Sequence, residues 1–129
     1  MIMEDTMTEP TMIILYVKDA AASAAFYGDL LGRAPVEVSP GFAMFVLSSG
    51  VKLGLWARDE VAPAVTAAPG GAELAIALAD ADAVRAAHAD WARRQRPVAQ
   101  PPTAMDFGYT FVALDPDGHR LRLYAPGAS

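Results

Sequence analysis

Runs of apolar residues alternate with turn signals along the chain and predict strands and helices in a definite order. Residues 13–17 form a short β-branched run that is typical of a strand. The alanine-rich residues 20–31 follow it and predict a helix. Ala22, Phe26 and Leu30 recur at i, i+4 and i+8 and predict the apolar face of this helix.

Two further strands and a linker complete the first half. Residues 42–47 and 51–57 are apolar runs separated by a loop of hairpin length that contains glycine. A weaker strand signal lies at residues 36–38. Residues 58–72 are rich in Ala, Pro and Gly and predict a linker.

The same order of elements returns after the linker, so the chain contains an internal repeat. A shift of 62 places Ile14 on Ile76, and a shift of 68 places Leu53 on Leu121. The repeat predicts two β-α-β-β-β modules, at about residues 11–57 and 73–126, within one domain of 129 residues. The second module is expected to contain strands at 74–79, 98–100, 108–114 and 119–125, and a helix at 83–96 with Val84, Ala87, His88 and Trp91 on one face.

Composition and charge narrow the class of protein. The absence of cysteine excludes disulfide scaffolds, thiolate metal sites and a cysteine nucleophile. Ten Lys and Arg stand against 15 Asp and Glu, and this net charge of −5 argues against binding to nucleic acid or to an anionic membrane surface. No window approaches the roughly 18 apolar residues of a membrane span, and residues 1–10 lack the pattern of a signal peptide, so a cytoplasmic protein is expected. Arg93, Arg94 and Arg96 form either a helix end or a local basic patch.

Two motifs resemble the vicinal oxygen chelate superfamily of glyoxalases, extradiol dioxygenases and bleomycin-resistance-type binding proteins. Residues 17–32 (VKDAAASAAFYGDLLG) are similar to the V-x-D-x-x-x-S-x-x-F-Y-x-x-x-L-G pattern of this family, and residues 115–123 (DPDGHRLRL) are similar to its D-P-D-G-x-x-x-E-L ending. The resemblance implies an α+β fold in which two tandem modules form a curled mixed sheet around a concave cavity. It also implies a homodimer.

Metal-using members of this superfamily place four ligands in the cavity. The motifs and the repeat offsets assign these positions to Met12, Gly54, Leu74 and Arg122. None of these residues supplies an imidazole or a carboxylate, the groups that divalent metals prefer. A slip of one residue would offer Glu73, but one carboxylate cannot hold a catalytic metal alone. No metal and no other cofactor is therefore expected.

Alternation along the strands predicts which side chains share the cavity face. If Gly54 points inward, Trp56 does too, and if Arg122 points inward, so do Arg120 and Tyr124. By the same reasoning Leu74 brings Ile76 inward. An indole for stacking and an arginine for a carboxylate suit a flat, partly anionic aromatic ligand. Trp56 could instead be an ordinary core or interface aromatic, and Arg122 could pair with an acidic side chain on the surface.

Within the superfamily, residues 41–57 and 106–126 resemble phenazine antibiotic resistance proteins, which bind and sequester a phenazine derivative. This resemblance implies homodimers with cavities between subunits, and it adds further residues to the site, although Met44 could equally be core filling. The expected ligand-binding residues are Trp56, Gly54, Arg122, Tyr124, Phe42, Met44, Met105, Phe107 and Tyr109. The resulting hypothesis is non-enzymatic sequestration of a planar aromatic antibiotic. The alternatives are a metal-dependent lyase or dioxygenase, and a metal-independent enzyme with His119 or Tyr109 as acid or base.

Overall fold

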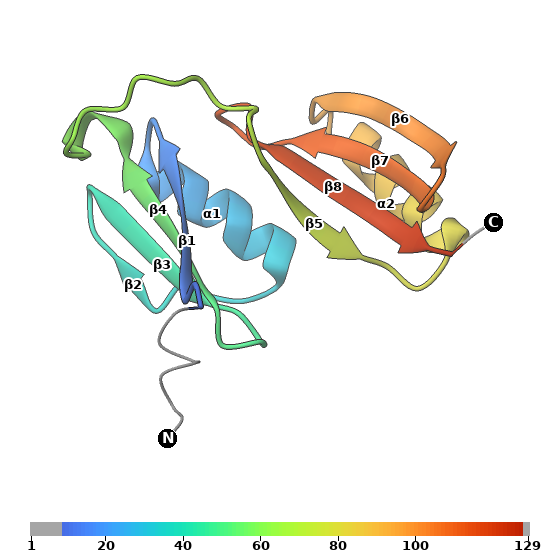
Figure 1. Ribbon diagram of the computed structural model, residues 1–129, viewed down its shortest axis with the longest axis horizontal. Coiled ribbons are helices and arrows are strands. Elements are labelled where there is room, and N and C mark those ends of the chain that lie inside the picture. Colours follow the sequence, from blue (N-terminus) through green and yellow to red (C-terminus); the bar gives the residue numbers. More distant parts are fainter. Residues whose placement is uncertain (1–8, 128–129) are drawn as a thin grey trace. The chain divides into compact units, whose positions relative to one another are not determined.

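The computed structural model describes residues 9–127, and the chain divides into two compact units, Met1–Thr66 and Ala67–Ser129. Each unit contains one four-stranded sheet and one α-helix that lies against one face of that sheet (Figure 1). The boundary falls in the segment rich in Ala, Pro and Gly. Neither described α-helix is long and apolar enough to cross a membrane.

The first module has the predicted β-α-β-β-β order. Its elements are β1 (Met12–Val17), α1 (Ala20–Leu31), β2 (Glu37–Val38), β3 (Phe42–Val46), β4 (Lys52–Ala57) and the short 3-10 helix η2 (Arg58–Glu60). The strand order in the sheet is β1-β4-β3-β2. β1 runs parallel to β4, whereas the pairs β2–β3 and β3–β4 are antiparallel.

The second module repeats this topology. Its elements are β5 (Glu73–Ala77), α2 (Ala81–Arg93), β6 (Val98–Met105), β7 (Gly108–Leu114) and β8 (Arg120–Pro126). The strand order is β5-β8-β7-β6, and β5 is again parallel to its neighbour β8. The predicted α+β fold of two tandem modules with mixed sheets is therefore confirmed. The homodimer stays a prediction.

α1 begins and ends as predicted, but the prediction of its buried face is wrong. The Asp19 carboxylate accepts a hydrogen bond from Ala22 N at 3.1 Å, and Gly32 ends the helix with a positive φ of 66°. The buried residues are Ala20, Ser23, Ala24 and Tyr27, not the set Ala22, Phe26 and Leu30. The small residues let the helix backbone approach the sheet closely, and Tyr27 supplies the bulk that fills the remaining space.

α2 buries the predicted face, with Val84 and Trp91 in the core. The indole Nε1 of Trp91 donates to the carbonyl of Pro97 at 3.0 Å. The helix ends at Arg93, three residues before the predicted end.

The arginine cluster at this end of α2 belongs to the helix terminus. Arg93 and Arg94 both form ion pairs with Asp90, and the Arg96 guanidinium lies 4.9 Å from the centre of the Trp91 ring. These contacts favour the helix-end interpretation over a free basic patch.

Candidate functional site

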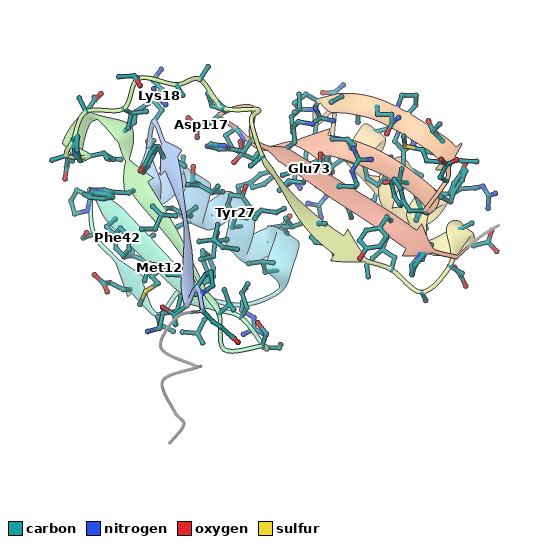
Figure 2. The ribbon with its side chains drawn as sticks, in the orientation of Figure 1. Met12, Lys18, Tyr27, Phe42, Glu73 and Asp117 are labelled. Carbon is teal, nitrogen blue, oxygen red and sulfur yellow. The ribbon has the colours of Figure 1, made fainter. Side chains whose placement is uncertain are left out.

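The first sheet has one face that its own helix does not cover. The register places a defined set of side chains there, because residues directly opposite each other on neighbouring strands point to the same side. We call this the first helix-free face, and it carries Met12, Ile14, Tyr16, Phe42, Met44, Val46, Lys52, Gly54 and Trp56. Met12 and Phe42 extend from it in Figure 2. The opposite face carries the buried side chains of Phe45, Leu53 and Leu55, which pack beneath α1.

Three aromatic side chains gather on the first helix-free face. Trp56 lies between Tyr16 on β1 and Phe42 on β3 in the register of the sheet. The rings of Tyr16 and Trp56 meet edge to face, with centroids 6.4 Å apart and an interplanar angle of 71°. Tyr16 is 38% exposed, and Trp56 and Phe42 are half-buried. This aromatic cluster of Tyr16, Phe42 and Trp56 can stack on a flat ligand.

Gly54 lies beside the aromatic cluster, but neighbouring side chains occupy the space above it. A Cβ atom at this position would lie 3.1 Å from Cζ of Phe42 and 3.3 Å from Sδ of Met12. Met44 is the β3 partner of Gly54 and lies on the same face. The absence of a side chain at Gly54 thus lets the Phe42 ring lie close to the sheet.

The second sheet also has a face that its helix does not cover. On β5, the residues that lie on this face are the alternate ones to those predicted. The parallel register pairs Leu74 with Leu121 and Ile76 with Leu123, whose side chains are buried on the helix side. The prediction that Leu74 and Ile76 share the face of Arg122 is therefore wrong, because the repeat offset at this strand is one residue shorter. The second helix-free face carries Glu73, Ala75, Ala77, Gln100, Thr103, Met105, Thr110, Val112, Leu114, Arg120, Arg122 and Tyr124.

Arg122 is held by a carboxylate on the neighbouring strand. Its Nε donates to Oε1 of Glu73 at 2.5 Å, and Nη2 lies 3.4 Å from the other carboxylate oxygen. Nη1 of Arg122 donates to Oε1 of Gln100 at 3.4 Å. Glu73 is the first residue of β5 (Figure 2). The sequence suggested that Arg122 could pair with an acidic side chain but did not identify it. The structure shows that this partner is Glu73 on β5.

The environment of Glu73 stabilises its charged form. The hydrogen bond from Arg122 lowers the pKa of the Glu73 carboxyl below its ordinary value of 4.5. Partial burial opposes this effect, and the charges of Arg122 and Arg120 add to it. Glu73 is therefore ionised at neutral pH and neutralises one of the two arginines.

Apolar groups surround this ion pair. The rings of Phe107 and Tyr124 meet edge to face with centroids 6.1 Å apart, and the Arg122 guanidinium lies 5.7 Å from the Phe107 ring centre. Met105 and Phe107 remain 43% and 45% exposed. These contacts bring Tyr124, Arg122, Met105 and Phe107 together at one place, and their role in ligand binding stays a prediction.

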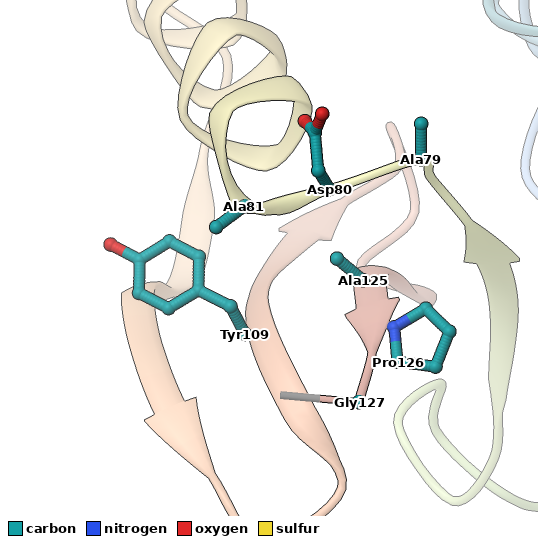
Figure 3. A pocket seen from close by; sticks show the side chains of 7 residues that line it. All are labelled: Ala79, Asp80, Ala81, Tyr109, Ala125, Pro126 and Gly127. Atoms are coloured by element: carbon teal, nitrogen blue, oxygen red, sulfur yellow. The ribbon is translucent and has the colours of Figure 1, made fainter. Parts of the chain in front are cut away.

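Tyr109 does not belong to this group. It pairs with Ala125 and points to the helix side, where the Arg85 guanidinium lies 4.8 Å from its ring centre. It lines an open pocket of about 300 Å³ at the start of α2 (Figure 3). The other side-chain polar group of that pocket is Asp80, which caps α2 by accepting from Ala83 N at 2.8 Å. The structure thus separates Tyr109 from Arg122 and Tyr124 by the thickness of the sheet.

The turn before β8 has a structural role. Oδ1 of Asp115 accepts hydrogen bonds from the backbone N–H groups of Asp117 and His119 at 2.9 and 2.8 Å. Asp115 is buried, and Gly118 supplies a φ of 94°. These carboxylates belong to a turn, as their spacing predicts.

The four positions that the family resemblance assigns to metal ligands do not fit a divalent metal here. The register corrects the third position from Leu74 to Glu73, so the groups present are a thioether, a glycine, a carboxylate and a guanidinium. The single carboxylate is already bound by the guanidinium. Within residues 9–127, no three His, Asp or Glu side chains converge as a metal site requires.

Comparison with known proteins supports the same interpretation of the fold. The family model of the glyoxalase/bleomycin resistance protein/dioxygenase superfamily matches residues 10–123. The chain is 29% identical over 117 residues to the phenazine antibiotic resistance protein EhpR of Enterobacter agglomerans, covering 88% of this chain and 89% of that protein.

Two solved structures are also similar. Protein ATC0852 of Agrobacterium tumefaciens shares 47% identity with a TM-score of 0.83, over 94% of this chain and 99% of that one. A glyoxalase-related enzyme of Fulvimarina pelagi shares 28% identity with a TM-score of 0.78, over 92% of this chain and 88% of that one.

Proposed function

The chain belongs to the glyoxalase/bleomycin resistance protein/dioxygenase superfamily, and from this premise we propose that it binds a planar aromatic antibiotic of the phenazine class without altering it. Sequestration of this kind protects a cell by mass action and needs no catalytic group. The similarity to a phenazine antibiotic resistance protein supports the choice of ligand class.

The aromatic cluster on the first helix-free face is the observation that carries this proposal. The edge-to-face contact of Tyr16 and Trp56 brings two partly exposed aromatic side chains together, and aromatic side chains of this kind stack on flat ligands. Phe42 and the thioether of Met44 extend the same surface with groups that adapt to a flat ligand. The cluster thus provides the apolar contact area that a small-molecule site requires.

The second helix-free face supplies the same ligand chemistry from different residues. Tyr124, Phe107 and Met105 are apolar groups beside the Arg122 guanidinium, so this face combines stacking surface with a charged group. The donor set at the four superfamily positions supports binding without a metal. We place the protein in the cytoplasm and expect it to act as a homodimer.

A fluorescence and calorimetric titration with phenazine-1-carboxylate tests the proposal. The chain has two tryptophans, and we expect the ligand to quench Trp56 emission, because the indole stacks on the ligand. In the Trp56→Ala variant the quenching should disappear, and binding should weaken by about 1 to 3 kcal/mol, the range observed for stacking of bases on aromatic side chains.

Phe26→Ala is the matched control. It removes a half-buried aromatic side chain from α1, on the other side of the same module. We expect this variant to bind the ligand as the parent protein does. The proposal fails if the parent protein does not bind phenazines, or if Trp56→Ala binds them with unchanged affinity.

A further inference from the structure

Glu73, Arg120 and Arg122 form a charged cluster on the second helix-free face. Arg120 and Arg122 point to the same side of β8, and Glu73 on β5 lies beside both. Nε of Arg120 lies 3.5 Å from Oε2 of Glu73, and Nε of Arg122 lies 2.5 Å from Oε1. Two guanidinium groups and one carboxylate leave this cluster with a net positive charge of one.

The two arginines differ in how far their donors are already used. Arg122 is 16% exposed and directs its nitrogens to Glu73, to Gln100 and toward Sδ of Met105. Its hydrogen-bonding capacity is therefore largely committed to groups of the protein.

Arg120 has most of its donors available. Within residues 9–127, its one polar contact is the 3.5 Å contact with Glu73, and its buried Nε makes no hydrogen bond. The side chain is 40% exposed. A buried donor without a partner is unfavourable, and a guanidinium binds a carboxylate through two parallel hydrogen bonds.

We propose that Arg120 is the residue of the second helix-free face that binds the carboxylate of an aromatic ligand, so that this face selects aromatic acids over the corresponding neutral amides. This inference rests on the proposed function. It assigns carboxylate binding to Arg120 and not to Arg122, the arginine that the sequence suggests for this role. The negative charge of Glu73 weakens this preference for acids, because it offsets the positive charge of one of the two arginines. Arg122 lies on the same side of β8 as Arg120 and contacts the same carboxylate, that of Glu73, so it adds cationic surface beside the anion site.

Phenazine-1-carboxylate and phenazine-1-carboxamide share one ring system and differ in charge. Calorimetry with both compounds therefore measures how much the negative charge of the ligand contributes to the free energy of binding. We expect the parent protein to bind the carboxylate about tenfold more tightly, as a charge-assisted hydrogen bond implies. Arg120→Gln should remove this preference and leave the affinity for the amide within about twofold.

Glu73→Gln should act in the opposite direction and strengthen carboxylate binding, because both guanidinium groups then lack a counter-charge. Arg93→Gln is the control, since it removes one positive charge from an exposed position at the end of α2. It should change neither affinity.

The outcomes separate this inference from the proposed function. Equal binding of both compounds by the parent protein overturns the selection of acids and leaves the stacking site standing. A preference that survives Arg120→Gln overturns the role of Arg120, as does weaker carboxylate binding in Glu73→Gln. Failure of both compounds to bind overturns the proposed function and this inference with it.

Discussion

Glu73 illustrates how the face on which one residue lies decides its chemistry. A carboxylate at this position can serve as a metal ligand in a suitable set of donors, but here Arg122 on the adjacent strand binds both of its oxygens. The repeat offset assigned this position to Leu74, and a shift of one residue along a strand exchanges the two faces. The parallel pairing of β5 with β8 determines the register, and no local pattern in residues 74–79 reveals it.

The ion pair of Glu73 should make stability depend on pH. Because the folded-state pKa of Glu73 is lowered, its contribution to the free energy of unfolding is present above the ordinary value of 4.5 and is lost as the pH falls through the lowered value. We expect Glu73→Gln to be less stable than the parent protein at pH 7 and to approach it below pH 4.5. Urea denaturation at a series of pH values measures the difference.

Glu37→Gln controls for the loss of one negative charge, since Glu37 lies at an exposed position on β2. The magnitude for Glu73 should stay near that of a partly exposed ion pair, at most about 1 kcal/mol. A stability difference between Glu73→Gln and the parent protein that is unchanged from pH 7 to pH 3 would contradict this account.

Several residues of the candidate site could be predicted because alternation fixes their common face. Trp56 and Gly54 lie two residues apart on one strand, and so do Tyr124 and Arg122. Tyr109 was assigned by resemblance, and the register places Thr110, not Tyr109, opposite Tyr124. Alternation also placed Arg120 on the face of Arg122, but anion binding was assigned to Arg122, because only the contacts of the two arginines distinguish them.

At the scale of elements, β6 departs most from its prediction. Residues 98–100 gave a weak strand signal, yet the strand extends to Met105 through Pro101 and Pro102. Proline is tolerated because β6 is an edge strand, and the ladder shifts register between Val98 and Thr103. The extended strand carries Gln100 and Met105 to the Arg122 guanidinium.

α1 shows the limit of helical periodicity in an alanine-rich segment. Alanine occurs on both the buried and the exposed sides of the helix. The spacing of Phe26 and Leu30 therefore predicted that their side of the helix is buried. In the structure the side that carries Tyr27 packs against the sheet instead. Helix bounds were easier to predict, since Asp19 and Gly32 supply local signals.

The hairpin between β6 and β7 depends on Gly108. This residue has a φ of 148°, and a Cβ atom would clash with the carbonyl oxygen of Ala125 on β8. Gly108→Ala should displace β7 from β8 and lower the free energy of unfolding by about 3 kcal/mol or more, measured by urea denaturation. It should also weaken ligand binding, because the hairpin carries Phe107.

Gly71→Ala provides the comparison. Among residues 9–127, a Cβ atom there would meet nothing within 4 Å beyond its two chain neighbours, and the residue has no positive φ. Its stability should stay within about 0.5 kcal/mol of the parent protein. Equal effects of the two substitutions would show that the close approach to Ala125 does not limit this position.

At the scale of the whole molecule, the tandem fold could be predicted because the chain repeats the same element order. Both sheets have the same strand order and the same parallel pairing of their first and last strands. The expected dimer rests on the family resemblance. The dimer stays a prediction.

Native mass spectrometry of the protein incubated with phenazine-1-carboxylate tests the central claim most directly, because it weighs the complex and the released ligand. We expect a complex whose ligand leaves with its mass unchanged and whose protein mass is a multiple of the 13.6 kDa chain without added metal. A released ligand of altered mass, a stoichiometric metal ion, or the absence of any complex would contradict binding without chemistry.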